Sequence, residues 1–331
     1  MNFMWPKNLI AIAIIRSFFY LRVYKHHALR KCHKFFFDKI FASSHTTLVN
    51  DRLSLQQDAS EKLSYELNLL GFTQGVLRSD MLPRLQEISD WANNVRLEPY
   101  FLIKRSKEYL KRIDLLSNHD IASLSLDLVL DDFFVSTAET YLNELPLLTD
   151  LTILVSESTD ENFTGSQLFH LDFDDSMNLK LFIPLGSVTE RSGPLQAIPK
   201  LASACTREKY SYKCGAISTC GIPSHSDTWG DLSGSAPVSF TGDLGSFVLI
   251  DTCNCFHRGS RKAKEARVML YAQFNTRSSF RYPPLNRIFY LDRLIDFSSP
   301  LYRKSFSLLT KEKHKYLLNT DEPHVAVRLL S

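Results

Sequence analysis

The sequence predicts a mainly β domain preceded by a helical N-terminal half. Apolar residues recur at helical spacing between residues 58 and 142, whereas short runs rich in β-branched and aromatic residues follow Thr149. Glycine, proline, serine and aspartate separate those later runs, as expected between strands. With 331 residues, of which 44% are hydrophobic and 23% charged, the chain can bury one main core, and we do not expect global disorder.

The first 50 residues form a basic and aromatic N-terminal extension. Residues 1–37 contain seven lysines and arginines and no acidic residue. One interpretation is a peripheral membrane contact, because basic residues attract anionic head groups and aromatic residues settle at the interface. The alternatives are a helix packed on the domain or a disordered tail. The apolar run at residues 9–15 is too short to span a bilayer and no small-residue cleavage site follows it, so we expect a cytoplasmic protein.

The charge balance bears on the partners of the domain. The whole chain carries a net charge of +3, so removing the seven basic residues of the extension leaves −4 for the remainder. A nucleic-acid-binding domain would need clustered lysine and arginine on its folded surface, and we therefore expect no nucleic-acid partner. The six cysteines are expected to be reduced thiols, because a chain of this length needs no disulfide bonds to be stable.

Helices are predicted in the first 150 residues. Leu63, Leu67 and Leu70 lie at helical spacing and Gly71 follows as a stop signal, which predicts a helix over residues 58–70. A second apolar stripe predicts a helix over residues 79–95, and such a stripe is typical of the buried face of a helix rather than of a cofactor site. The remaining helices are predicted at residues 101–113 and 128–142.

Strands are predicted in the second half of the chain. Their candidates are residues 151–156, 166–173, 179–185, 195–199, 246–251 and 267–275. The segment 203–242 is rich in serine, glycine and proline and has little periodicity, so we expect a long loop, of the kind that often forms a lid or binds a ligand. Within this organisation residues 51–331 form one domain, with a helical part at 58–148, a β core at 150–280 and a helical or irregular segment at 281–331.

His170 and Asp172 lie two residues apart in a predicted strand, and residues two apart point to the same face of a sheet. His257 completes a set of two imidazoles and one carboxylate. Such a set covers one face of an octahedral Fe(II) ion and leaves three positions open, of which a chelating cosubstrate takes two and O2 takes one.

A second His-x-Asp motif competes with the first. A chain of this composition is expected to contain roughly one such motif by chance. His225 and Asp227 lie in loop-like sequence, where nothing holds their side chains on one face, so we interpret this motif as part of a loop. A zinc site built from His225 and cysteines is a weak alternative, because the spacing lacks a Cys-x2-Cys pair. The cysteines concerned are Cys205, Cys214 and Cys220.

Three blocks of sequence resemble the phytanoyl-CoA dioxygenase family. The first runs Ser-Gln-Leu-Phe-His-Leu-Asp over residues 166–172, and the second contains Ser-Gly-Pro-Leu-Gln-Ala-Ile-Pro over residues 192–199. The third comprises Gly-Asp-Leu-Gly-Ser-Phe at 242–247 and Phe-His-Arg-Gly at 256–259, with Arg267 ten residues after the histidine. The resemblance covers roughly residues 60–280. It departs from the family after Pro199, where Lys200-Leu201-Ala202 replaces the common Gly-Ser-His.

The resemblance implies a double-stranded β-helix (jelly roll, cupin-like) flanked by helices, with a metal site at one end of the barrel. It implies that His170, Asp172 and His257 bind Fe(II) and that Arg267 binds the distal carboxylate of 2-oxoglutarate, with O2 as the second cosubstrate. Ser260 lies one position later than the hydroxyl that often assists in this family, and Lys180 could also reach a carboxylate of the cosubstrate.

The expected activity is hydroxylation of a small-molecule or lipid-like substrate. Related halogenases have glycine or alanine at the position of Asp172, so its presence favours hydroxylation over halogenation. A catalytically inactive jelly-roll binding module that lies on a membrane is the alternative. Among the neighbouring residues, Asp174 and Asp175 are expected in a solvated turn, and Cys253 and Cys255 as small buried hydrophobic residues.

Overall fold

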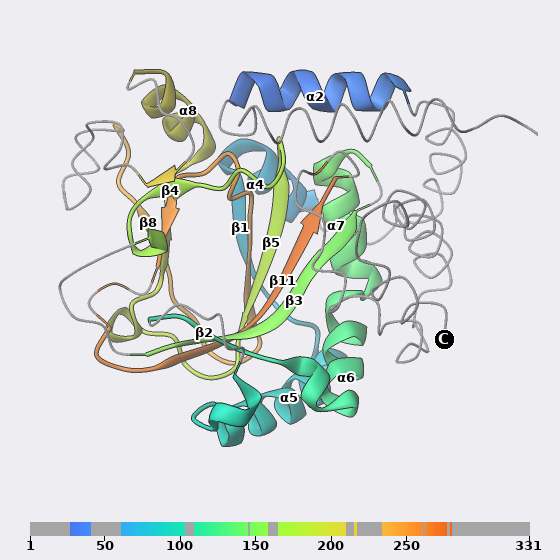
Figure 1. The fold of residues 1–331 in the computed structure, drawn as a ribbon, viewed down its shortest axis with the longest axis vertical. Helices are drawn as coiled ribbons and strands as arrows, with labels where there is room; N and C mark the ends of the chain where they lie inside the picture. The colour runs from blue at the N-terminus through green and yellow to red at the C-terminus, as the bar shows by residue number, and fades with distance from the viewer. Residues whose placement is uncertain are drawn as a thin grey trace, which may run out of the picture.

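The computed structural model describes residues 27–40, 61–102, 109–144, 146–157, 165–209, 215–216, 234–259, 261, 263–276 and 279. In this part of the chain, strands form two antiparallel sheets (Figure 1). The six-stranded sheet has the order β1-β9-β5-β11-β3-β2, and the five-stranded sheet the order β7-β4-β10-β6-β8. The strands are β1 (Phe72–Val76), β2 (Lys111–Ile113), β3 (Leu147–Ser156), β4 (His170–Leu171), β5 (Asn178–Pro184), β6 (Leu195–Ala197), β7 (Gly215–Ala216), β8 (Val238–Phe240), β9 (Ser246–Ile250), β10 (His257–Arg258) and β11 (Arg267–Asn275).

The order of the strands identifies the fold. From β3 to β6, and again from β8 to β11, the chain crosses between the two sheets so that β4, β6, β8 and β10 share one sheet and β3, β5, β9 and β11 the other. Neighbouring strands pair antiparallel throughout. Two facing antiparallel sheets connected in this way form a double-stranded β-helix, or jelly roll, which confirms the predicted fold class.

Helices cover the outer face of the six-stranded sheet. Along β11 the residues alternate: Leu270 and Phe274 join the core beneath the helices, whereas Arg267 and Met269 face the barrel interior. This alternation separates a structural core from the side chains that line the inside of the barrel. The helices that contribute to this core are α4 (Glu61–Leu70), α5 (Leu82–Val95), α6 (His119–Val129) and α7 (Asp132–Leu142). The other described helices are α2 (His27–Ile40) and α8 (Lys200–Lys209).

The predicted helix at 128–142 is two helices. Helix α6 ends at Val129, and the carboxylate of Asp131 accepts a hydrogen bond from the backbone N–H of Phe133, which caps the start of α7. An aspartate at this position satisfies an N–H group that has no partner within the helix and favours a new start. The predicted helices at 58–70 and 79–95 agree with the structure over the residues that it describes.

Other predictions of local structure were wrong. In the predicted helix at 101–113, residues 111–113 form β2, because they pair with β3 at the edge of the sheet. The predicted strand at 166–173 is a strand only at His170–Leu171, after a 3-10 helix at Gly165–Gln167. The predicted loop at 203–242 begins inside helix α8 and ends with β8, while residues 217–233 lie outside the described residues.

Helix α2 lies across one end of the barrel and belongs to the fold (Figure 1). Arg30 is fully buried, and Nη1 donates a hydrogen bond to the backbone carbonyl of Asp172 at 2.8 Å. Lys34 forms an ion pair with Glu144 at 2.8 Å. Among the alternatives for the N-terminal extension, the helix packed on the domain therefore holds for this part. Of the described helices, none combines the length and the apolar character needed to cross a membrane.

Candidate metal centre

The pairing of two short strands brings two histidines together. His170 begins β4 and His257 begins β10, and the two residues are direct partners in the antiparallel register. Their ring centroids lie 4.2 Å apart. Side chains of directly opposed residues point to the same face of a sheet, so both imidazoles project to one side. His257 also pairs with Ala197 on β6, which fixes β10 in the middle of its sheet.

Asp172 lies just after β4 rather than within it, so strand parity alone does not direct its side chain. Its backbone is held from two sides: the N–H donates to the carbonyl of Thr252 at 2.9 Å, and the carbonyl accepts from Arg30. Neither contact was visible in the sequence, since both partners are more than 75 residues away along the chain.

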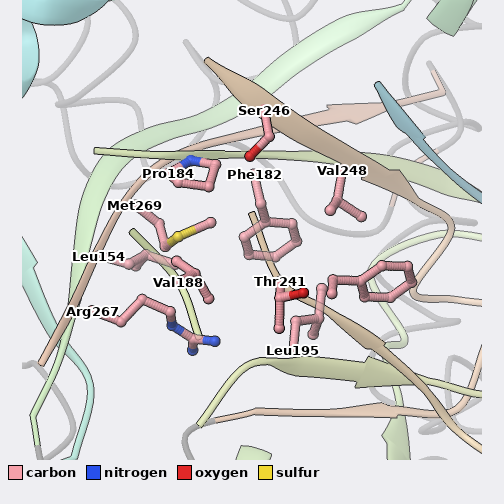
Figure 2. A pocket seen from close by; sticks show the side chains of 11 residues that line it. Leu154, Phe182, Pro184, Val188, Leu195, Thr241, Ser246, Val248, Arg267 and Met269 are labelled. Atoms are coloured by element: carbon pink, nitrogen blue, oxygen red, sulfur yellow. The ribbon is translucent and has the colours of Figure 1, made fainter. Parts of the chain in front are cut away.

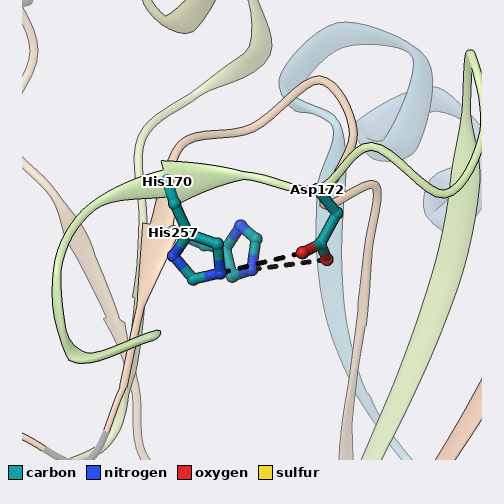
Figure 3. A group of neighbouring side chains, drawn as sticks. All are labelled: His170, Asp172 and His257. Atoms are coloured by element: carbon teal, nitrogen blue, oxygen red, sulfur yellow. Dashed lines mark ion pairs between the residues drawn. The ribbon is translucent and has the colours of Figure 1, made fainter. Parts of the chain in front are cut away.

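The three side chains converge on one small volume (Figure 3). Nε2 of His170 lies 3.7 Å from Oδ1 of Asp172, and Nε2 of His257 lies 3.7 Å from Oδ2. One ligand atom from each residue lies within 4.8 Å of the other two. Among the described residues this is the only group of three or more histidine, cysteine, aspartate or glutamate side chains with such geometry.

The hydrogen bonds of the histidines orient both rings for metal binding. Nδ1 of His170 lies 2.8 Å from the carbonyl of Leu168, and Nδ1 of His257 lies 3.1 Å from the carbonyl of Cys255. A carbonyl only accepts hydrogen bonds, so each Nδ1 carries the proton. In the neutral ring Nε2 then has its lone pair directed at the shared volume, as in histidines that bind metals.

The protonation states also suit a cation. Burial, together with the neighbouring His170, lowers the pKa of His257 to about 3, which leaves a neutral ligand at neutral pH. Burial alone would raise the pKa of Asp172, but the adjacent ammonium of Lys180 holds it well below its usual value. The site thus offers two imidazole nitrogens and one anionic carboxylate, a donor set that fits Fe(II) and other divalent transition metals.

Lys180 is a further member of the site. It lies on β5, is 8% exposed, and its Nζ donates to Oδ2 of Asp172. Burial opposes the charged form, but the adjacent carboxylate raises the pKa of Lys180 above its usual value, so the ammonium persists. The predicted contact of Lys180 with a cosubstrate stays a prediction. In the structure Lys180 contacts Asp172, a candidate metal ligand.

Arg267 begins β11 and lines a pocket inside the barrel (Figure 2). Its Nη1 donates to the carbonyl of Gly193 at 2.8 Å, and Nη2 contacts Oγ of Ser156 at 3.3 Å. Burial lowers the pKa of Arg267 to about 10, so the guanidinium stays charged at neutral pH. It is the one charged residue among the eleven that line the pocket, which are otherwise mostly apolar: Leu154, Phe182, Pro184, Val188, Leu195, Phe240, Thr241, Ser246, Val248 and Met269.

Other predicted residues have mixed outcomes. Cys253 and Cys255 are fully buried, as expected. The prediction of a solvated turn at Asp174 and Asp175 was wrong, because both are buried. The carboxylate of Asp175 accepts from Thr276 and Ser176, and that of Asp174 accepts from Gln273. Several candidates lie outside the described residues, namely Ser260, Cys214, Cys220, His225 and Asp227.

Asp175 is expected to make stability depend on pH. Burial raises its pKa from 3.8 to about 7. Because the folded pKa is the higher one, the stabilisation is complete below about pH 4 and is lost as the pH rises through 7. Between pH 5 and pH 8 the free energy of unfolding of the wild type should fall by about 3 kcal/mol relative to Asp175→Asn. Urea unfolding of both proteins at the two pH values measures this difference, and a difference independent of pH would contradict it.

The fold and the site together define a class: a jelly-roll protein whose barrel carries two histidines and one aspartate arranged as a metal site. No family model and no curated protein matches the chain.

Solved structures with a similar fold do exist. EctD from S. alaskensis, solved with 2-oxoglutarate and 5-hydroxyectoine, is 17% identical, with 67% of this chain and 78% of that chain covered and a TM-score of 0.46. The epimerase SnoN, in complex with Fe3+, alpha ketoglutarate and nogalamycin RO, is 15% identical, with coverages of 72% and 90% and a TM-score of 0.48. The carbocyclase SnoK from nogalamycin biosynthesis is 16% identical, with coverages of 72% and 92% and a TM-score of 0.47. Since these TM-scores lie below 0.5, the assignment of the fold depends on the strand order within this chain.

Proposed function

We propose that the protein is an Fe(II)- and 2-oxoglutarate-dependent oxygenase of the phytanoyl-CoA dioxygenase type. The observation that supports this most is the combination of the His170, Asp172 and His257 group with a buried guanidinium inside the same barrel. When bound, iron and 2-oxoglutarate supply the activation of O2 and the electrons for oxidation of the substrate. The chain contributes ligands, an anchor for the cosubstrate and a pocket of low polarity.

In this proposal Arg267 holds the far carboxylate of 2-oxoglutarate. A Cβ atom on Gly259 would lie 3.5 Å from Nη2 of Arg267, so the guanidinium adjoins the chain two residues after His257. The guanidinium thus lies near the segment that carries His257, where the planar fork of the arginine can meet one end of a short dicarboxylate whose other end chelates the metal.

The pocket next to Arg267 would shield a bound cosubstrate from water. Phe182, Leu195 and Met269 contribute apolar surface there, and Thr241 and Ser246 add hydroxyl groups (Figure 2). In such surroundings a charge-assisted hydrogen bond is stronger than in water. The presence of Asp172 as a carboxylate ligand supports hydroxylation rather than halogenation as the reaction. The substrate in this proposal is a small-molecule or lipid-like compound.

Formation of succinate tests the proposal. Protein purified without oxygen is mixed with Fe(II) and 2-oxoglutarate and then exposed to O2; succinate should appear only when all three are present. Anaerobic calorimetry with Mn(II) in place of iron should show that 2-oxoglutarate binds only after the metal. If the protein neither forms succinate nor binds 2-oxoglutarate, the inactive binding module is the better description.

A further proposal concerns the N-terminal extension. Peripheral membrane contact would have to involve residues other than Arg30 and Lys34, because these two contact the domain. Sedimentation with vesicles of anionic lipid compares the full chain with a chain that lacks residues 1–26. Equal binding of the two proteins would exclude a membrane role for this segment.

A further inference from the structure

We infer that Lys180 couples metal binding to binding of the anionic 2-oxo acid, because its ammonium shares the Asp172 carboxylate with the metal. This inference rests on the proposed function. It concerns how tightly the site holds its two components, and in what order they bind, rather than which reaction follows.

The position of Lys180 is fixed by its strand. Lys180, Phe182 and Pro184 alternate along β5, and the latter two line the pocket inside the barrel, so Lys180 points to the same interior. Its Nζ donates to Oδ2 of Asp172, the oxygen that lies 3.7 Å from Nε2 of His257. The ammonium therefore borders the volume in which a metal ion would contact its ligands.

A metal ion in this volume faces the ammonium at close range. Asp172 carries one negative charge, which a divalent ion and Lys180 would then share. Burial weakens solvent screening, so the repulsion between the ion and the ammonium opposes metal binding strongly. With the metal alone, the site carries an excess of positive charge.

Besides Asp172, few groups near Lys180 can balance the charge of its ammonium. The ring of Tyr271 lies with its centroid 5.8 Å from Nζ, and Asp174 adds a favourable electrostatic interaction. Oδ2 of Asp174 already accepts a hydrogen bond from Gln273 at 3.0 Å.

A 2-oxo acid that brings a carboxylate to the metal supplies the missing negative charge beside Lys180. By linkage, the acid then strengthens metal binding by the same factor by which the metal strengthens binding of the acid.

The test measures the affinity for Mn(II) by calorimetry without O2, in the absence and in the presence of saturating 2-oxoglutarate. Lys180→Met and Lys180→Gln should bind Mn(II) alone at least ten-fold more tightly than the wild type. The gain in Mn(II) affinity caused by 2-oxoglutarate should be at least ten-fold smaller in both variants. Glutamine keeps a hydrogen-bond donor for Asp172, so it separates the effect of charge from that of the hydrogen bond.

Two further variants serve as controls. Lys180→Arg retains the charge and should behave like the wild type. Lys111→Met removes a lysine from β2, at the edge of the same sheet, and should leave both affinities unchanged. Thermal unfolding confirms that each variant is folded.

The outcomes separate this inference from the function on which it rests. Should the wild type bind neither Mn(II) nor 2-oxoglutarate, the proposed function itself fails. Should the wild type bind both while the uncharged variants show unchanged or weaker Mn(II) affinity, only the role of Lys180 is refuted. In that case Lys180 merely holds the Asp172 side chain in place.

Discussion

Replacing His257 with alanine is expected to lower the affinity for Fe(II) by more than about 100-fold and to abolish succinate formation. Changes to residues that only support metal ligands already cost 10- to 100-fold, so the loss of a ligand should cost more. His257 supplies a neutral nitrogen whose lone pair is oriented by the carbonyl of Cys255. Metal binding is measured by calorimetry and turnover by succinate formation.

His119→Ala is the matched control for this prediction. His119 is exposed at the start of helix α6, whereas His257 belongs to the centre of the second sheet. The control should bind metal and form succinate like the wild type. Undiminished succinate formation by His257→Ala would remove His257 from the metal centre and, with it, the basis of the oxygenase assignment.

Replacing Arg267 with leucine is expected to weaken the binding of 2-oxoglutarate by about 100-fold while leaving metal affinity nearly unchanged. A pair of charge-assisted hydrogen bonds in a buried pocket contributes several kcal/mol, and about 1.4 kcal/mol corresponds to a factor of ten. Arg267→Lys should retain only part of the affinity, because a lysine cannot form the paired contact. Titration of the manganese-loaded protein with 2-oxoglutarate gives both values.

Arg191→Gln provides the control for the arginine series. Arg191 forms an exposed ion pair with Glu265, a kind of contact that contributes little to stability. Its replacement should leave the affinity for 2-oxoglutarate unchanged. If Arg267→Leu binds 2-oxoglutarate as tightly as this control, the distal carboxylate is held elsewhere in the barrel.

Much of the β core could be predicted from the sequence because alternation and β-branched residues mark strands locally. The predicted strand 267–275 coincides with β11, and 179–185 nearly coincides with β5. The short strands were harder to predict from the sequence. Residues 111–113 have no distinct pattern of their own, and β2 exists because the edge of β3 offers backbone partners. The two-residue strand β10 exists because it lies between β4 and β6.

The long strands and the candidate ligands could be identified from the amino-acid sequence, since strand periodicity and residue chemistry are local properties. The folded structure was needed to show that His257 lies opposite His170, 87 positions earlier in the chain, and that Arg30 contacts Asp172. It also showed that Asp174 and Asp175 are buried and that Lys180 contacts Asp172. Pairing across sheets and loss of solvent depend on contacts between distant segments, and no local pattern of residues specifies those contacts.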